Sequence, residues 1–242
     1  LPIARRTRNM PTALMGAINV TPDSFSQTTG RIQHEDLIQQ FQKMLELNVA
    51  YVDIGAESTR PGATAVSSDE EWRRLEPLLG FWKSVREDHP FTQLSLDTYH
   101  PETARRALDY KVEVLNDVSH LSNPAMRELA PHFNSVVLMH SLSVPADRNK
   151  TWRENSDVIK ELKDWFDKTM DQVTLPTHKT IFDPGLGFGK TALQSMQILQ
   201  RVGELADLPV RRLIGHSRKS FMTHFSATPA YDRDLETLGA SV

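Results

Sequence analysis

Six residues with hydrogen-bonding or ionisable side chains stand where short apolar runs of the chain end. They are Asn19, Asp53, Asp97, Asn116, His140 and Asp183, and a seventh run ends at Gly215. Two carboxylates and a carboxamide, Asp97, Asn116 and Asp183, would suit a flat ligand with several N–H donors, such as the edge of a guanidine-like heterocycle. A two-metal hydrolase could use the same groups, although such sites usually add histidines and His140 is the only histidine directly at the end of a run.

The segment after the second run, residues 53–63, can bind an anion. The guanidinium of Arg60 can fork onto a phosphate or a carboxylate, and the flanking glycines let the backbone approach a ligand. Asp53 and Glu57 are equally suited to structural pairing with arginines such as Arg60, and we favour that role for both acids.

Other polar residues follow the first and the last of these runs. The amide oxygen of Asn19 could bind Mg²⁺ or a phosphate-bound water, with a simple Asx-turn as the alternative. After the last run, Ser217 is a neutral donor and Lys219 is a point charge suited to a phosphate or a ring carbonyl. Loops at this place in α/β barrels often bind phosphate, whereas a solvated basic turn is the ordinary alternative.

Residues 183–191 come close to a phosphate-binding P-loop but do not match it. The pattern requires a glycine five positions before Gly189, and that position holds Pro184. A helix that begins near Thr191 could still bind an anion at its N-terminus, and Phe188 could stack against a flat ring.

The elements that must position these residues alternate between strand and helix. The apolar runs predict strands, and helical periodicity lies between most of them, for example over residues 35–48, 69–86 (interrupted at Pro77), 154–173 and 191–202. Alternation of this kind implies parallel strands, and active-site loops of a parallel barrel follow the C-terminal ends of its strands. We therefore expect an α/β fold of the (β/α)₈ TIM-barrel class rather than an open doubly wound sheet.

The predicted barrel stops short of eight units. A helical pattern near residues 232–242 would be its seventh helix, and no eighth strand follows. The final βα unit is therefore expected to be missing from this sequence. The length of 242 residues fits one domain, 1–242, which could be part of a longer or fused chain.

Composition excludes several other classes of protein. A net charge of -3 argues against a nucleic-acid-binding surface, and no apolar segment is long enough to cross a membrane. The basic N-terminal residues are not followed by the apolar region of a secretory signal. The absence of cysteine excludes disulfides and thiolate metal sites and fits a cytoplasmic location.

Taken together and in this order, several motifs resemble the dihydropteroate synthase family. They are Met15-Gly-Ala-Ile-Asn-Val-Thr-Pro-Asp-Ser-Phe-Ser26, Asp53-Ile-Gly-Ala-Glu-Ser-Thr-Arg-Pro-Gly-Ala63, Ser95-Leu-Asp-Thr98, Asn116-Asp-Val118, Asp183-Pro-Gly-Leu-Gly-Phe-Gly-Lys-Thr191 and Ser217-Arg-Lys-Ser220. The resemblance implies a (β/α)₈ barrel that condenses 6-hydroxymethyl-7,8-dihydropterin diphosphate with 4-aminobenzoate. The products would be 7,8-dihydropteroate and pyrophosphate, formed by an SN1-like substitution with Mg²⁺ assistance. It also implies a homodimer and a target of sulfonamides.

The resemblance assigns roles to individual residues. Asp97, Asn116, Asp183 and Lys219 match the pterin pocket, and Met139, Phe188 and Gly215 line it. Asn19 matches the residue that helps to hold Mg²⁺ and the diphosphate. The 4-aminobenzoate side corresponds to Phe25, Thr59, Arg60, Pro61, Ser217 and Lys219, and the expected catalytic residues are Lys219, Asp97 and Arg60.

Departures from the family pattern leave other functions open. Ala56 and His120 stand where the family usually has glycine, and the family's C-terminal Arg-x-His pair, which reaches the diphosphate, has no counterpart in this sequence. A pterin-binding methyltransferase shares the pocket but needs no Ser-Arg-Lys-Ser loop. A non-catalytic pterin-binding homologue and a metal hydrolase are the remaining alternatives.

Overall fold

The computed structural model describes residues 12–21, 34–59, 63–144, 147, 150–153, 156–217 and 219. Among the predicted site residues, Phe25, Arg60 and Pro61 lie outside these ranges. The helix expected after Lys219 and the helical pattern near residues 232–242 lie outside them too.

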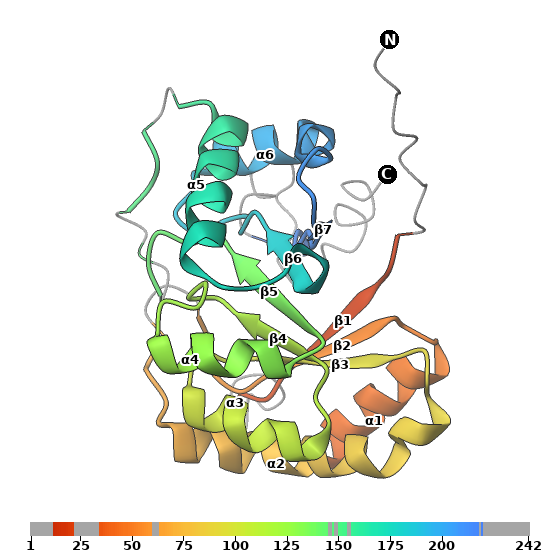
Figure 1. Ribbon diagram of the computed structural model, residues 1–242. Coiled ribbons are helices and arrows are strands. Elements are labelled where there is room, and N and C mark those ends of the chain that lie inside the picture. The colour runs from red at the N-terminus through yellow and green to blue at the C-terminus, as the bar shows by residue number, and fades with distance from the viewer. Residues whose placement is uncertain are drawn as a thin grey trace.

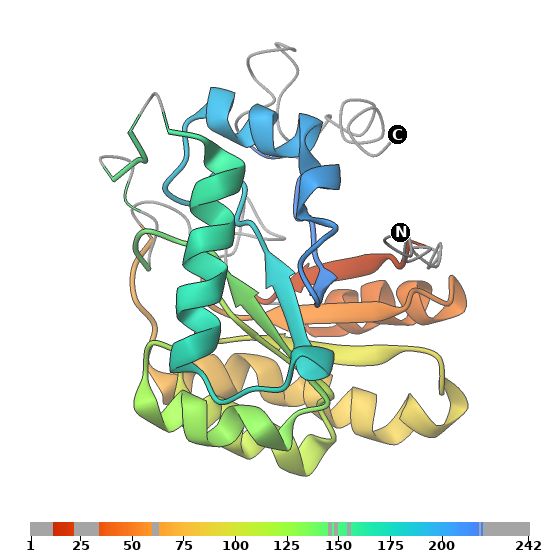
Figure 2. The same ribbon diagram turned by 45° about the horizontal axis from the view of Figure 1, so that its top comes forward.

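The strands form one parallel sheet of seven, in the order of the sequence. Their bounds are β1 Met15–Asn19, β2 Tyr51–Gly55, β3 Gln93–Asp97, β4 Val114–Asp117, β5 Ser135–Met139, β6 Thr180–Asp183 and β7 Arg211–Arg212. The sheet curls, with β6 and β7 turned back toward β1 (Figure 2). Over the described residues, this arrangement confirms the predicted parallel α/β barrel fold.

The helices pack on the outside of the curled sheet (Figure 1). They are α1 His34–Glu46, α2 Ser68–Val85, α3 Pro101–Ala107, α4 Pro124–Leu129, α5 Val158–Gln172 and α6 Ala192–Gln200, with the short 3₁₀ segments η2 Arg86–Asp88, η3 Leu108–Tyr110, η4 Ala130–His132, η5 Thr177–Lys179 and η6 Val202–Leu205. Pro101 begins α3, as expected of a proline in the first helical turn. Helix α5 begins later than predicted, because the Asp157 side chain caps it by accepting from the amides of Ile159 and Lys160.

The predicted interruption at Pro77 is wrong, because α2 runs through this residue. Pro77 lies on the exposed face of the helix, where water can reach the carbonyl that the missing N–H leaves free. The opposite face buries Leu75, Leu78 and Trp82. Burial of this apolar face outweighs the cost of one absent hydrogen bond.

Side chains alternate between the two faces of the sheet. Outward residues such as Leu94, Leu115 and Val136 pack with the helices, whereas Val114 and Val137 form a separate apolar cluster with Ile181. Residues two positions apart share a face of a strand. Asp97, Asn116, Met139 and Asp183, at or next to the last positions of β3 to β6, therefore point inward, above this inner cluster.

Arg211 of β7 lies at the end of the curled sheet where the strands begin, opposite to their C-terminal ends. Its guanidinium donates to the Tyr51 hydroxyl at the start of β2 (2.9 Å) and to the Ser135 hydroxyl at the start of β5 (2.6 Å). One side chain thus ties β7 to β5 and, across the curled sheet, to β2. Among the described residues, no helix is long and apolar enough to cross a membrane.

Candidate active site

The strand ends come together at one edge of the sheet, as the sequence predicts. Asn19 is paired with Gly55, Gly55 with Asp97, and Asp97 with Asn116 across successive strands. On the other side, Met139 is paired with Asp183. All of these residues occupy inward positions, so the side chains of Asn19, Asp97, Asn116, Met139 and Asp183 surround a common space at the C-terminal mouth.

Asp97 presents an open carboxylate at this mouth. Gly55 makes room for it, because a Cβ at Gly55 would lie 3.1 Å from Asp97 Cβ and 3.3 Å from its Oδ2. Within the described part of the chain, no donor is hydrogen-bonded to the Asp97 carboxylate. Burial, followed by the negative charges of Asp53, Glu71, Asp117 and Glu57, raises the pKa of Asp97 well above its usual value.

Asn116 is oriented by a carboxylate deeper in the barrel. Its Nδ2 donates to Asp53 Oδ2 (3.2 Å), and the Ser95 hydroxyl donates to Asp53 Oδ1 (2.5 Å). Burial raises the pKa of Asp53, an effect that these two hydrogen bonds oppose. The described partners of Asp53 are thus neutral donors on β3 and β4, and its expected pairing with Arg60 lies outside the described residues.

Asp183 and Lys219 face each other beside Gly215. A Cβ at Gly215 would lie 3.9 Å from Lys219 Nζ and 4.0 Å from Asp183 Oδ2, so the missing side chain keeps this space open. The Gly185 amide donates to Asp183 Oδ1 (2.8 Å). Burial raises the pKa of Asp183, whereas Lys219, the Gly185 amide and Lys190 act in the opposite direction. Burial likewise lowers the pKa of Lys219, and Asp183 opposes that shift.

Lys219 also connects this carboxylate to the loop between β6 and α6. Its Nζ donates to the Leu186 carbonyl (2.8 Å) and lies 4.8 Å from the centre of the Phe188 ring. Phe188 is half-buried, so one side of its ring remains accessible for stacking. A buried acid, a lysine and an aromatic ring therefore stand around one opening.

The β6–α6 loop does not work as a P-loop. Thr191 and Gln194 form a reciprocal capping box that occupies amides at the start of α6. Lys190, which would need to reach a phosphate, is buried and donates to the carbonyls of Gly185 (2.9 Å) and Phe188 (3.0 Å). Residues 183–191, which come close to the P-loop pattern in sequence, thus have a different local structure.

Met139, Thr59, Asn19 and Ser217 are the remaining predicted site residues that the structure describes. Met139 is buried at the end of β5, Thr59 is half-buried, and Asn19 and Ser217 are exposed. The structure brings together Asp97, Asn116, Met139, Asp183, Phe188, Gly215 and Lys219 around the mouth. Their roles toward a ligand remain predictions.

The sequence did not reveal a cluster that anchors the loop after β2. Glu57 accepts from the Tyr99 hydroxyl and from the Val66 amide (3.1 Å), and its Oε2 is 2.7 Å from His100 Nε2. Glu71 lies nearby, and the ligand atoms of Glu57, Glu71 and His100 are within 4.8 Å of one another. Tyr99 and His100 directly follow the Ser95–Thr98 motif, and this adjacency is the one feature of the sequence that could have indicated the cluster.

His120, the residue where the resembling family has glycine, adopts a left-handed conformation with φ 49°. Glycine enters this region without steric cost, so the backbone explains the family's preference. The histidine is accommodated with its ring edge-on to Trp165 (5.4 Å between centroids).

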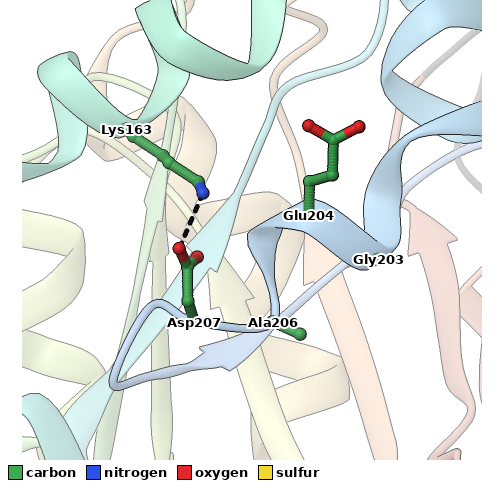
Figure 3. A pocket seen from close by; sticks show the side chains of 5 residues that line it. All are labelled: Lys163, Gly203, Glu204, Ala206 and Asp207. Carbon is green, nitrogen blue, oxygen red and sulfur yellow. Dashed lines mark hydrogen bonds and ion pairs between the residues drawn. The ribbon is translucent and has the colours of Figure 1, made fainter.

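A hollow on the outer surface is unrelated to this mouth. Lys163 of α5 and Gly203, Glu204, Ala206 and Asp207 line it, and Lys163 Nζ is paired with Asp207 Oδ2 at 2.7 Å (Figure 3). None of the predicted site residues contributes to its lining. We therefore place the candidate site at the strand ends.

Comparisons with known proteins show the family of this chain. Residues 15–242 match the family described as pterin binding enzyme. A probable bifunctional folylpolyglutamate synthase/dihydropteroate synthase of Haloferax volcanii is 33% identical over 238 residues, which are 97% of this chain and 28% of the relative. The dihydropteroate synthase of Synechocystis sp. is 35% identical over 218 residues, 87% of this chain and 73% of the relative.

Solved structures show the same fold. The dihydropteroate synthase of Anaplasma phagocytophilum with bound 6-hydroxymethylpterin-monophosphate has a TM-score of 0.84 and 28% identity, covering 95% of this chain and 87% of that one. The Xanthomonas albilineans enzyme with 4-aminobenzoic acid has a TM-score of 0.79 and 31% identity, covering 94% and 81%. The chain spans only 28%, 26% and 53% of the length of the first three curated relatives it matches.

Proposed function

The chain belongs to the pterin-binding enzyme family, and from this premise we propose that it acts as a dihydropteroate synthase. It would join 6-hydroxymethyl-7,8-dihydropterin diphosphate to 4-aminobenzoate and release pyrophosphate. The observation that carries the proposal is the grouping of two inward acids, the buried Asp183 and the half-buried Asp97, with the Asn116 amide, Lys219 and Phe188 around one mouth. Relatives named dihydropteroate synthase support it.

The pocket suits the pterin ring by its hydrogen-bonding character. Asp183 and the open carboxylate of Asp97 can accept from N–H groups at the edge of the ring, and Asn116 can both donate and accept. Phe188 offers a face for stacking, and Lys219 can donate to a ring oxygen or nitrogen. A ring without these N–H donors would leave the buried acids unpaired and would bind weakly.

The exposed amide of Asn19 fits a role in holding Mg²⁺. It lies at the inward end of β1, next to Gly55, where the substrate's diphosphate would extend from the pterin pocket. Mg²⁺ commonly takes only one or two protein oxygens and completes its shell with phosphate oxygens and water. When bound, the ion would neutralise charge on the departing diphosphate.

The protein's own residues would act mainly by position. Asp97, Asn116 and Asp183 would hold the ring, while Lys219 would fix the ring next to the 4-aminobenzoate, together with Thr59 and Ser217 and with Phe25, Arg60 and Pro61, which lie outside the described residues. Orientation and preorganised charge can lower the barrier of a dissociative substitution without a strong base. Sulfonamides would compete on the 4-aminobenzoate side. The homodimer and the cytoplasmic location stay predictions.

The test is Mg²⁺-dependent release of pyrophosphate by the full-length protein, with and without 4-aminobenzoate. We expect release to require 4-aminobenzoate and to fall by about 100-fold or more in Lys219→Ala. Lys163→Ala, which removes a half-buried lysine of the outer hollow, serves as the matched control and should keep full activity. Tight pterin binding without release would instead identify a non-catalytic pterin-binding homologue.

A further inference from the structure

Lys190 is a buried lysine behind the candidate pocket, and the mechanism above gives it no role. Only 6% of its surface is exposed. Its Nζ lies 2.8 Å from His140 Nδ1, 2.9 Å from the Gly185 carbonyl and 3.0 Å from the Phe188 carbonyl, with the His140 carbonyl farther away at 3.4 Å. An ammonium has three N–H donors, and the three nearest acceptors match them.

The acceptor on His140 requires a neutral imidazole. Burial, followed by the charge of Lys190, lowers the pKa of His140 to about 2, so its Nδ1 can accept a hydrogen bond throughout the physiological range. The Trp152 ring covers the ammonium at 5.0 Å from its centroid. Lys190 is therefore enclosed and cannot itself contact a ligand in the mouth.

The groups that Lys190 binds are those that shape the pocket. The Gly185 carbonyl belongs to the residue whose amide donates to Asp183. The Phe188 carbonyl belongs to the residue whose ring faces Lys219. Lys190 thus holds the loop from behind, while Lys219 binds the intervening Leu186 carbonyl from the side of the mouth.

Lys190 also joins this loop to the neighbouring strand. His140 follows Met139 at the end of β5, and its amide donates to the Asp183 carbonyl (2.8 Å). Because one ammonium contacts both His140 and the β6–α6 loop, it fixes the distance between two walls of the pocket.

We propose that Lys190 is a positioning residue for pterin binding: it holds the β6–α6 loop against β5 and places a second positive charge behind Asp183. The inference rests on the proposed function, because it concerns the same pocket. Lys190→Met keeps the length of the side chain but removes its donors and charge. Lys190→Gln restores donors without the charge.

The chain offers a matched control at the opposite end of β6. Lys179 also holds two backbone carbonyls, those of Pro131 (2.9 Å) and Phe133 (3.0 Å), but it lies at the start of the strand. Lys179→Met therefore reports what the loss of a carbonyl-binding lysine does to the fold in general.

The experiment measures the binding of 6-hydroxymethylpterin to the full-length protein by calorimetry. We expect Lys190→Met to weaken binding by about 10-fold or more, the factor for one lost charged hydrogen bond. Lys179→Met should bind like the wild type, and Lys190→Gln should bind between wild type and Lys190→Met. In turnover, Lys190→Met should raise KM for the pterin diphosphate and leave KM for 4-aminobenzoate unchanged at saturating pterin.

The pH dependence separates positioning from simple loss of stability. Lys219, Lys190 and Asp53 are the ionisable groups that act on Asp183. Burial lowers the pKa of Lys190 well below its usual value, so its charge is lost as pH rises. Removing Lys190 also leaves Asp183 protonated up to a higher pH, so the binding deficit should be larger at about pH 6 than at about pH 9.

Equal binding by Lys190→Met and the wild type would overturn this inference and leave the proposed function intact. Parallel changes in both KM values, or variants that do not fold, would also overturn it, because the lysine would then support the fold in general. No pterin binding by the wild type would instead refute the proposed function.

Discussion

Gly185→Ala should damage both stability and pterin binding, because the backbone at this position has no room for a side chain. Gly185 has φ +63°, and an added Cβ would lie 2.0 Å from the His140 carbonyl oxygen. Both the left-handed backbone and the contact with a backbone atom oppose the substitution. The loop would have to move away from β5.

The magnitude follows from these two effects. A left-handed alanine costs about 1–2 kcal/mol, and relief of an overpacked contact costs about 1–3 kcal/mol. Together they predict a loss of about 2–5 kcal/mol in the free energy of unfolding, or about 4–20 °C in Tm for a chain of this size. The same movement would pull the Gly185 amide away from Asp183 and its carbonyl away from Lys190.

Thermal unfolding and calorimetric binding of 6-hydroxymethylpterin would measure the two effects. Gly80→Ala is the control, since Gly80 lies on the exposed side of α2 with no atom within 4 Å of an added Cβ. That change should stabilise the protein by about 0.5–1 kcal/mol and leave binding unchanged. If Gly185→Ala had the Tm and the pterin affinity of the wild type, the argument that this loop is pressed against β5 would be refuted.

Three further predictions concern charge and space at the mouth. Asp97→Asn should raise the Tm of the ligand-free protein and abolish pterin binding, because burial and nearby acids raise the pKa of Asp97. Because the pKa of Asp97 is higher in the native state than in the unfolded state, the free energy of unfolding of the wild type should fall as pH rises above the unfolded-state pKa. Unfolding measured as a function of pH should show a weaker fall in Asp97→Asn. Gly55→Ala would press on Asp97 at 3.1 Å and should weaken pterin binding, measured by calorimetry, with little change in Tm. Asp207→Asn, which breaks the exposed pair with Lys163, should change neither turnover nor pterin affinity, and a clear loss of either would move the site toward the outer hollow.

The strands and the polar residues at their ends could be predicted because both leave local signals in the sequence. An apolar run that stops at Asp97 or Asn116 shows where a buried strand reaches the mouth, and parallel pairing then places these ends together. The internal partner of Asn116 could not be predicted in this way. Asp53 is separated from it by 63 positions, and only the register of β2, β3 and β4 brings the two side chains into contact.

The buried contacts of Lys190 could not be predicted from the sequence, for a different reason. Its motif resembles a phosphate-binding loop, in which a lysine points toward the ligand, and the direction of a side chain is set by packing rather than by spacing. Here Trp152, His140 and two carbonyls surround the ammonium. The continuation of α2 through Pro77 could not be predicted from the sequence either, because it depends on the exposure of this face of the helix.

The desolvation of the acids at the mouth costs stability, and this cost is related to the binding of the proposed ligand. Asp53, Asp97 and Asp183 all have raised pKa values, and burial is the largest cause for each. Water no longer solvates these acids fully. Of the three, only Asp183 has its pKa lowered by Lys219 and Lys190. A ligand that supplies N–H donors would restore the lost solvation at Asp97, where the described residues donate no hydrogen bond. The cost of desolvating Asp97 would thus be recovered only when a donor-rich ring is bound, which would make the proposed pocket selective for that ring.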